Sequence, residues 1–283
     1  MDFKYDLINI TKKILDDNGI DHNKAGKEIL YYYVDRMIRF IDSGVSYTIK
    51  YSDEFTNTIE SLTKEQLSGV KEIEQRLRNK ESITGFLSNT LFSPIHKDID
   101  TLLKNWNIHH AHLSENRSSS LLFFIQEQET IYFIDVLEHP KCNDWFKRHL
   151  LKVLASNWPW LLREAPGVTK VIKPLNDKDV HRESSDKFIL LELGDSVVMP
   201  TNFGVTSSGI SNYAVMKVDS ILEMLDEWQA NFQNHATELT ADIRKQISIE
   251  LDKPLQLILI IEDNWFIAYD KNHQIKIPMF CEP

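Results

Sequence analysis

Residues 108–139 read IHHAHLSENRSSSLLFFIQEQETIYFIDVLEH, and this stretch decides the fold of the middle of the chain. It contains three runs rich in β-branched and aromatic residues: Ile108–Leu113, Ser120–Gln126 and Ile131–Leu137. Runs of this length and composition are typical of strands, and the polar turn Glu127–Thr130 joins the last two. The stretch therefore predicts an antiparallel meander.

Helical patterns lie on both sides of the predicted sheet. Before it, Thr63–Gln66 has the form of a capping box that opens a helix ending near Lys80. Ile95–Trp106 predicts a short helix, and a longer one is expected from about Asp144 to Asn157. Another amphipathic helix is predicted from apolar and aromatic positions at three- and four-residue spacing, which are Ile29, Tyr32, Tyr33, Met37 and Phe40.

The last third of the chain combines both kinds of pattern. Strand signals occur at Phe188–Leu193 and Val197–Met199, and a long amphipathic helix is expected from about Val215 to Ile249. Two terminal strands, Gln256–Glu262 and Trp265–Asp270, predict a hairpin around Asp263-Asn264.

Together these patterns predict an α+β protein. We expect a helical region over 1–92, a central antiparallel β module with flanking helices over 93–162, a charged connector over 163–182 and an acidic α+β module over 183–283.

Composition restricts the class of protein. The formal net charge of −10 is concentrated at the C-terminal end, where residues 181–283 hold 8 Lys+Arg against 16 Asp+Glu. An open nucleic-acid surface is normally basic, so a constitutive DNA binder is disfavoured. Two distant cysteines, no signal-peptide pattern and no apolar run of membrane-spanning length predict a soluble, cytoplasmic protein with no membrane partner.

Candidate site residues lie in and around the first and third predicted strands. Alternation places His109, Ala111 and Leu113 on an inward face, and His110 and His112 on a solvent-accessible one. In the third strand, alternation puts Tyr132, Ile134 and Val136 on an apolar face. Asp135 and the following His139 then lie opposite. We expect these polar residues to converge, with Arg117 reaching them from the link between strands: His110, His112, Arg117, Asp135 and His139.

These residue types fit phosphodiester cleavage. A histidine can remove or donate a proton near neutral pH, and an arginine can stabilise phosphate charge, so the reaction needs neither metal nor cofactor. We assign His110 or His112 as base, His139 as acid or base, Arg117 as phosphate stabiliser and Asp135 as the group that orients a histidine. A metal-dependent enzyme is the alternative that the same His-x-His strand allows, with His139 or Asp135 as a further ligand.

The run from Arg117 to His139 resembles the RelE/ParE-type toxin superfamily, over roughly residues 95–160. The resemblance implies helices followed by an antiparallel sheet, with Arg117 near a strand start and His139 after the last strand. It also implies a ribonuclease-like effector of a toxin or phage-defence system that acts on RNA or the ribosome. An antitoxin-like protein is one expected partner. Separately, the apolar stripe of the long helix is expected to be either core or an interface with a second copy, and its positions are Ile221, Leu222, Leu225, Trp228 and Phe232.

Two further interpretations stay open from the residues alone. The chain is alternatively a non-catalytic binding or regulatory protein that keeps the sheet without the chemistry. The acidic C-terminal segment is most simply a solvated surface, but it could also mimic nucleic acid and cover the histidine-rich face.

Overall fold

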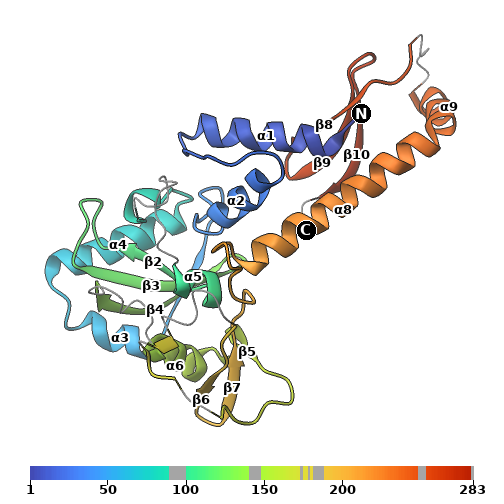
Figure 1. The fold of residues 1–283 in the computed structure, drawn as a ribbon. Helices are drawn as coiled ribbons and strands as arrows, with labels where there is room; N and C mark the ends of the chain where they lie inside the picture. The colour runs from blue at the N-terminus through green and yellow to red at the C-terminus, as the bar shows by residue number, and fades with distance from the viewer. Residues whose placement is uncertain are drawn as a thin grey trace. The chain divides into compact units, whose positions relative to one another are not determined.

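The computed structural model describes residues 1–88, 100–139, 148–172, 175–177, 179–180, 188–247 and 253–281 (Figure 1). Contacts within the chain divide it into two compact units. Unit 1 joins residues 1–34 to residues 214–283, and unit 2 comprises residues 35–213. The chain passes from one unit to the other within helices α2 (Glu28–Met37) and α8 (Asn212–Asn234). The domain boundaries expected at residues 92, 162 and 182 stay a prediction. Contacts between residues divide the chain after residues 34 and 213.

The fold is α+β, and unit 2 is built on a four-stranded sheet in the order β1-β4-β3-β2 (Figure 1). The strands are β1 (Thr48–Tyr51), β2 (His109–His112), β3 (Ser120–Glu127) and β4 (Thr130–Glu138). β2, β3 and β4 pair antiparallel, which confirms the predicted meander. The short strand β1 was not predicted, because it lies in a segment otherwise helical in pattern. It pairs in parallel with β4.

A bulge in β4 corrects the predicted faces of this strand. Phe123 pairs with Asp135 but its neighbour Phe124 pairs with Phe133, so Ile134 is an extra residue on β4. Ile134 packs on one side of the sheet and Val136 on the other. The prediction that both share one apolar face is therefore wrong, because a bulge shifts the alternation by one residue.

Helices cover both faces of the sheet (Figure 1). On one face α3 (Asp53–Ile59) and α4 (Lys64–Arg78) pack against Leu122, Phe124 and Phe133. On the other, α5 (Thr101–Trp106) and α6 (Arg148–Asn157) pack against Phe123 and Ile134. Strands buried on both sides read as near-continuous apolar runs, as β3 and β4 do.

The helices of unit 2 follow their predicted signals. Thr63 and Gln66 exchange both bonds of a capping box at the start of α4. The C-terminal ends of the two predicted helices are confirmed, because α5 ends at Trp106 and α6 ends at Asn157. Their predicted first residues, 95–99 and 144–147, lie outside the described residues. A small sheet in the order β5-β7-β6 completes the unit, and its strands are Arg163–Glu164, Ser196–Met199 and Leu191–Leu193.

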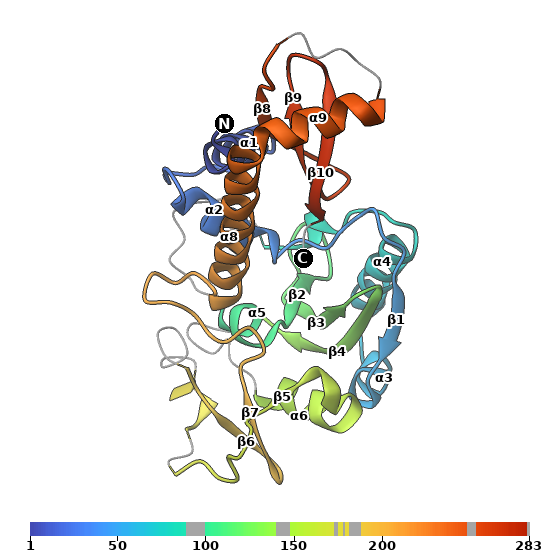
Figure 2. The ribbon, with the colours of Figure 1, turned by 90° about the vertical axis from the view of Figure 1, so that its right-hand side faces the viewer.

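Unit 1 combines helices with a three-stranded antiparallel sheet (Figure 2). The helices are α1 (Phe3–Asp17), most of α2 and α8, and α9 (Ala236–Ile247); the strands are β8 (Leu257–Glu262), β9 (Trp265–Asp270) and β10 (Ile275–Cys281). The predicted hairpin is confirmed. Asp263 and Asn264 both have positive φ, 48° and 64°, as a two-residue hairpin turn requires.

One predicted helix of this unit is wrong in extent. The segment expected to be continuous from Val215 to Ile249 forms two helices that break at His235. The residues before the break, Asn-Phe-Gln-Asn, include two asparagines, whose side chains compete for backbone hydrogen bonds. Of the apolar positions in this helix, Ile221, Leu225 and Phe232 are buried as core residues, whereas Leu222 and Trp228 are partly buried.

No helix in the described ranges combines the length and the apolar character needed to cross a bilayer.

Candidate functional site

The structure places four of the five predicted site residues close to one another. His110 and His112 lie on β2, Arg117 in the link that follows it, and His139 directly after β4. The rings of His112 and His139 are stacked, with centroids 5.6 Å apart and an interplanar angle of 23°. The charges of Arg117 and His139 both act on His112. Asp135 belongs to a different group, described below.

One ring nitrogen of His112 donates a hydrogen bond to the backbone, which leaves the other as an acceptor. Its Nδ1 lies 3.2 Å from the carbonyl oxygen of Ser118. Because a carbonyl oxygen only accepts, Nδ1 carries the hydrogen and Nε2 of the neutral ring has the free lone pair. Burial lowers the pKa of His112; the Ser118 carbonyl opposes this, and nearby positive charges lower it further. His112 is therefore neutral at pH 7 and suited to act as a base.

His110 lies on the same side of β2, and His112 itself is only 5% exposed. The Nδ1 of His110 lies 3.5 Å from Oδ2 of Asp100, and only 10% of the His110 side chain is exposed. Asp100 also caps α5, since its Oδ1 accepts the Leu103 N–H. Burial lowers the pKa of His110. The prediction that His110 and His112 share a solvent-accessible face is wrong, because α5 and α6 cover that side of the sheet.

Two local features fix the end of β2 beside His112. Gly69 of α4 lies against the backbone of Leu113, where an added Cβ would stand 1.8 Å from the carbonyl oxygen. Only glycine allows the helix to approach this closely. In the link itself, Arg117 adopts a φ of 66° and donates its backbone N–H to Ser114. The Arg117 side chain and His139 are exposed.

Asp135 orients a histidine that the sequence did not single out. The Asp135 carboxylate is 3% exposed, and His149 Nε2 lies 2.8 Å from its Oδ2. Its Oδ1 accepts bonds of 2.8 Å from the Thr58 hydroxyl and from the Val136 N–H. Asp135 and His110 both pair with Phe123, so they share a face of the sheet with β3 between them. The hydrogen-bond partners of Asp135 come from α3, from α6 and from its own strand, and its convergence with His110 and His112 stays a prediction. His149 comes from α6, and no sequence spacing links it to β4.

A buried ion pair in the same unit was also missed. Lys104 Nζ lies 2.7 Å from Asp35 Oδ2, and their side chains are 6% and 9% exposed. Lys104 also donates to the carbonyl of Gly209 at 2.6 Å, and the Ser211 N–H donates to Asp35 at 2.8 Å. Burial lowers the pKa of Lys104, while Asp35 acts in the opposite direction. These bonds fix the loop 204–211 against α5.

No three His, Cys, Asp or Glu side chains in the described part of the chain are placed to hold one ion, and this part includes His110, His112, Asp135 and His139. The His-x-His metal alternative therefore has no ligand set among the described residues.

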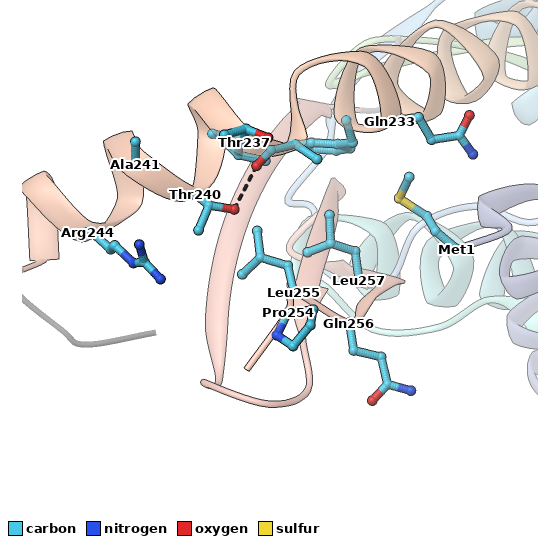
Figure 3. A pocket seen from close by; sticks show the side chains of 13 residues that line it. Met1, Gln233, Thr237, Thr240, Ala241, Arg244, Pro254, Leu255, Gln256 and Leu257 are labelled. Carbon is cyan, nitrogen blue, oxygen red and sulfur yellow. Dashed lines mark hydrogen bonds between the residues drawn. The ribbon is translucent and has the colours of Figure 1, made fainter. Parts of the chain in front are cut away.

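A cavity of about 620 Å³ lies in unit 1, away from all five predicted residues (Figure 3). Its lining comes from α8, α9 and the segment Pro254–Leu257, and it is mainly apolar apart from a few polar side chains and Arg244 (Figure 3). Nothing in its lining provides an acid–base pair.

Comparison of the chain with protein-family models, curated proteins and solved structures finds no match.

Proposed function

We propose that this chain is an endoribonuclease-like effector that cleaves RNA by acid–base chemistry at the end of the central sheet. His112 is the base that takes the proton from a ribose 2′-hydroxyl. His139 is the acid that protonates the leaving 5′-oxygen, and Arg117 stabilises the charge that develops on the phosphate. Proton transfer and charge stabilisation both come from side chains, so the route uses no metal.

The observation that carries the proposal is the arrangement of His112. One ring nitrogen is fixed on the Ser118 carbonyl, the pKa is lowered, and a second, exposed histidine ring is stacked 5.6 Å away. This combination provides a neutral base next to a group able to donate a proton. A structural role for His112 alone would not require His139 beside it.

Arg117 adds independent support. A non-glycine residue in the left-handed region is uncommon, and asparagine is several-fold enriched there whereas arginine is not. The exposed Arg117 has a φ of 66°, directly after Asn116, which would suit that conformation better. The Arg117 guanidinium can hold a phosphate through two parallel bonds.

The resemblance to the RelE/ParE-type superfamily supports the same activity. Within residues 95–160, helix α5 precedes the antiparallel strands β2, β3 and β4, and the resemblance implies this order. The setting in a toxin or phage-defence system, and RNA or the ribosome as target, come from the resemblance.

The test is cleavage of total RNA and of translating ribosomes in the presence of EDTA. We expect His112→Ala and His139→Ala each to lower the rate by about a hundredfold to ten-thousandfold. His235→Ala is the control, because it removes an exposed histidine of unit 1 that the proposed site does not include; His235 pairs with Glu238 at 3.0 Å. Equal cleavage by all three variants, or none by the wild type, would refute the proposal and favour a binding or regulatory protein.

A further inference from the structure

The group formed by Thr58, Asp135 and His149 has no role in the proposed cleavage. It joins three elements, α3, β4 and α6. The carboxylate is buried, but half of the His149 side chain is exposed. A buried acceptor that holds an exposed imidazole is a way to present one chosen ring nitrogen to a ligand.

The hydrogen bonds decide which nitrogen is presented. An ionised carboxylate accepts but cannot donate, and the two Asp135 oxygens face donors from Thr58, Val136 and His149. In the neutral ring of His149, Nε2 therefore carries the hydrogen and Nδ1 is an acceptor. Nδ1 is not used in the bond to Asp135, so a hydroxyl group from a ligand can donate to it.

Its position relates this acceptor to the proposed cleavage site. α6, which carries His149, covers the sheet face that holds His112. Asp135 and His139 are four residues apart along the chain, a span of roughly 13 Å at about 3.3 Å per residue. A single-stranded polynucleotide bound at His139 is long enough to reach His149 with a neighbouring nucleotide.

We propose that His149 is a specificity-determining residue that accepts a hydrogen bond from a ribose 2′-hydroxyl near the cleaved bond. Thr58 and Asp135 are positioning residues that fix its tautomer. The 2′-hydroxyl is the group by which a protein distinguishes RNA from DNA at a given nucleotide. This inference rests on the proposed function, because it assumes that RNA binds at His112 and His139.

The test measures binding to a short single-stranded RNA taken from a cleaved sequence. Its scissile 2′-hydroxyl is replaced by hydrogen to prevent cleavage, and its other 2′-hydroxyls are then removed one at a time. For the wild type we expect one removal to weaken binding by about threefold to tenfold, as loss of one hydrogen bond does. His149→Leu should show no further loss at that position. His149→Gln should keep the effect, because its amide can donate to Asp135 and accept from the hydroxyl.

A second readout does not depend on RNA. The nitrogen chemical shifts of the His149 ring should report a hydrogen on Nε2 in the wild type, and a mixture of tautomers in Asp135→Asn. His235→Leu serves as the control in the binding series. If RNA is cut but His149→Leu responds to every 2′-hydroxyl as the wild type does, this inference is wrong and the proposed function stands. If the wild type neither binds nor cuts RNA, both fail.

Discussion

Replacement of Gly69 by alanine tests whether helix propensity or the close packing of α4 against Leu113 has the larger effect on stability. Gly69 lies inside α4, where alanine is favoured over glycine by about 1 kcal/mol. The added Cβ, however, would stand 1.8 Å from the carbonyl oxygen of Leu113 and 2.7 Å from its carbonyl carbon. These are backbone atoms, which cannot rotate away, so α4 and β2 must separate by more than an ångström to restore ordinary contact. Overpacking of a well-packed core costs about 1–3 kcal/mol, and this overlap belongs at or above the upper end. We therefore expect a net destabilisation of about 2 kcal/mol or more.

Urea unfolding followed by tryptophan fluorescence measures this change. Ser68→Ala is the matched control, because Ser68 precedes Gly69 in the same helix and is exposed. Its substitution should stabilise slightly, by about 0.5 kcal/mol, through helix preference alone. If Gly69→Ala is as stable as Ser68→Ala, the close approach of α4 to Leu113 is not what positions this end of the sheet. Because His112 precedes Leu113, Gly69→Ala should also disturb the stacked histidine pair.

Three further substitutions test interactions within unit 2 and within unit 1. Burial lowers the pKa of His109 from 6.5 to about 4, so the unfolded chain binds a proton in this range that the native protein does not. Stability should therefore fall by about 3 kcal/mol as the pH drops from 6.5 to 4, and His109→Phe should flatten that part of a pH-dependent unfolding series. Lys104→Met leaves Asp35 buried without its cation and should cost about 3–5 kcal/mol in urea unfolding. A loss below 1 kcal/mol would show that water reaches the carboxylate. In the hairpin of unit 1, Asn264→Val should lower stability by about 1–2 kcal/mol, because a β-branched residue disfavours positive φ, whereas Asn264→Gly should be nearly neutral in thermal unfolding.

Local signals predicted most individual elements. The meander from β2 to β4, the capping box at Thr63 and the turn at Asp263-Asn264 each depend on residues adjacent in sequence, and all three are present. β1 could not be predicted this way, because a four-residue strand is defined by its partner β4 and not by its own pattern. The association of residues 1–34 with the C-terminal segment likewise depends on contacts far apart in the chain.

For the site, alternation predicted correctly that His110 and His112 share a face, but not what covers that face. Coverage depends on α5 and α6, whose positions no pattern within β2 encodes. Asp135 illustrates a second cause. Its hydrogen-bond partners Thr58 and His149 come from α3 and α6, which no pattern within β4 encodes. Val136 illustrates a third cause, because the extra residue Ile134 shifts the period-two alternation of β4.

The covered sheet also restricts where chemistry can take place in unit 2. Since helices occupy both faces, the accessible polar groups of the meander lie at its two ends. One end is the turn with Glu127, Gln128 and Glu129, and the other is where β2 ends, β3 begins and β4 ends. The antiparallel register brings these points together, because His112 pairs with Leu121 and Ser120 pairs with Glu138. Arg117 and His139 are exposed at this end, and His112 is the histidine of β2 closest to it. The proposed RNA substrate therefore has to reach a strand end, as an extended polynucleotide does, and cannot lie across an open face of the sheet.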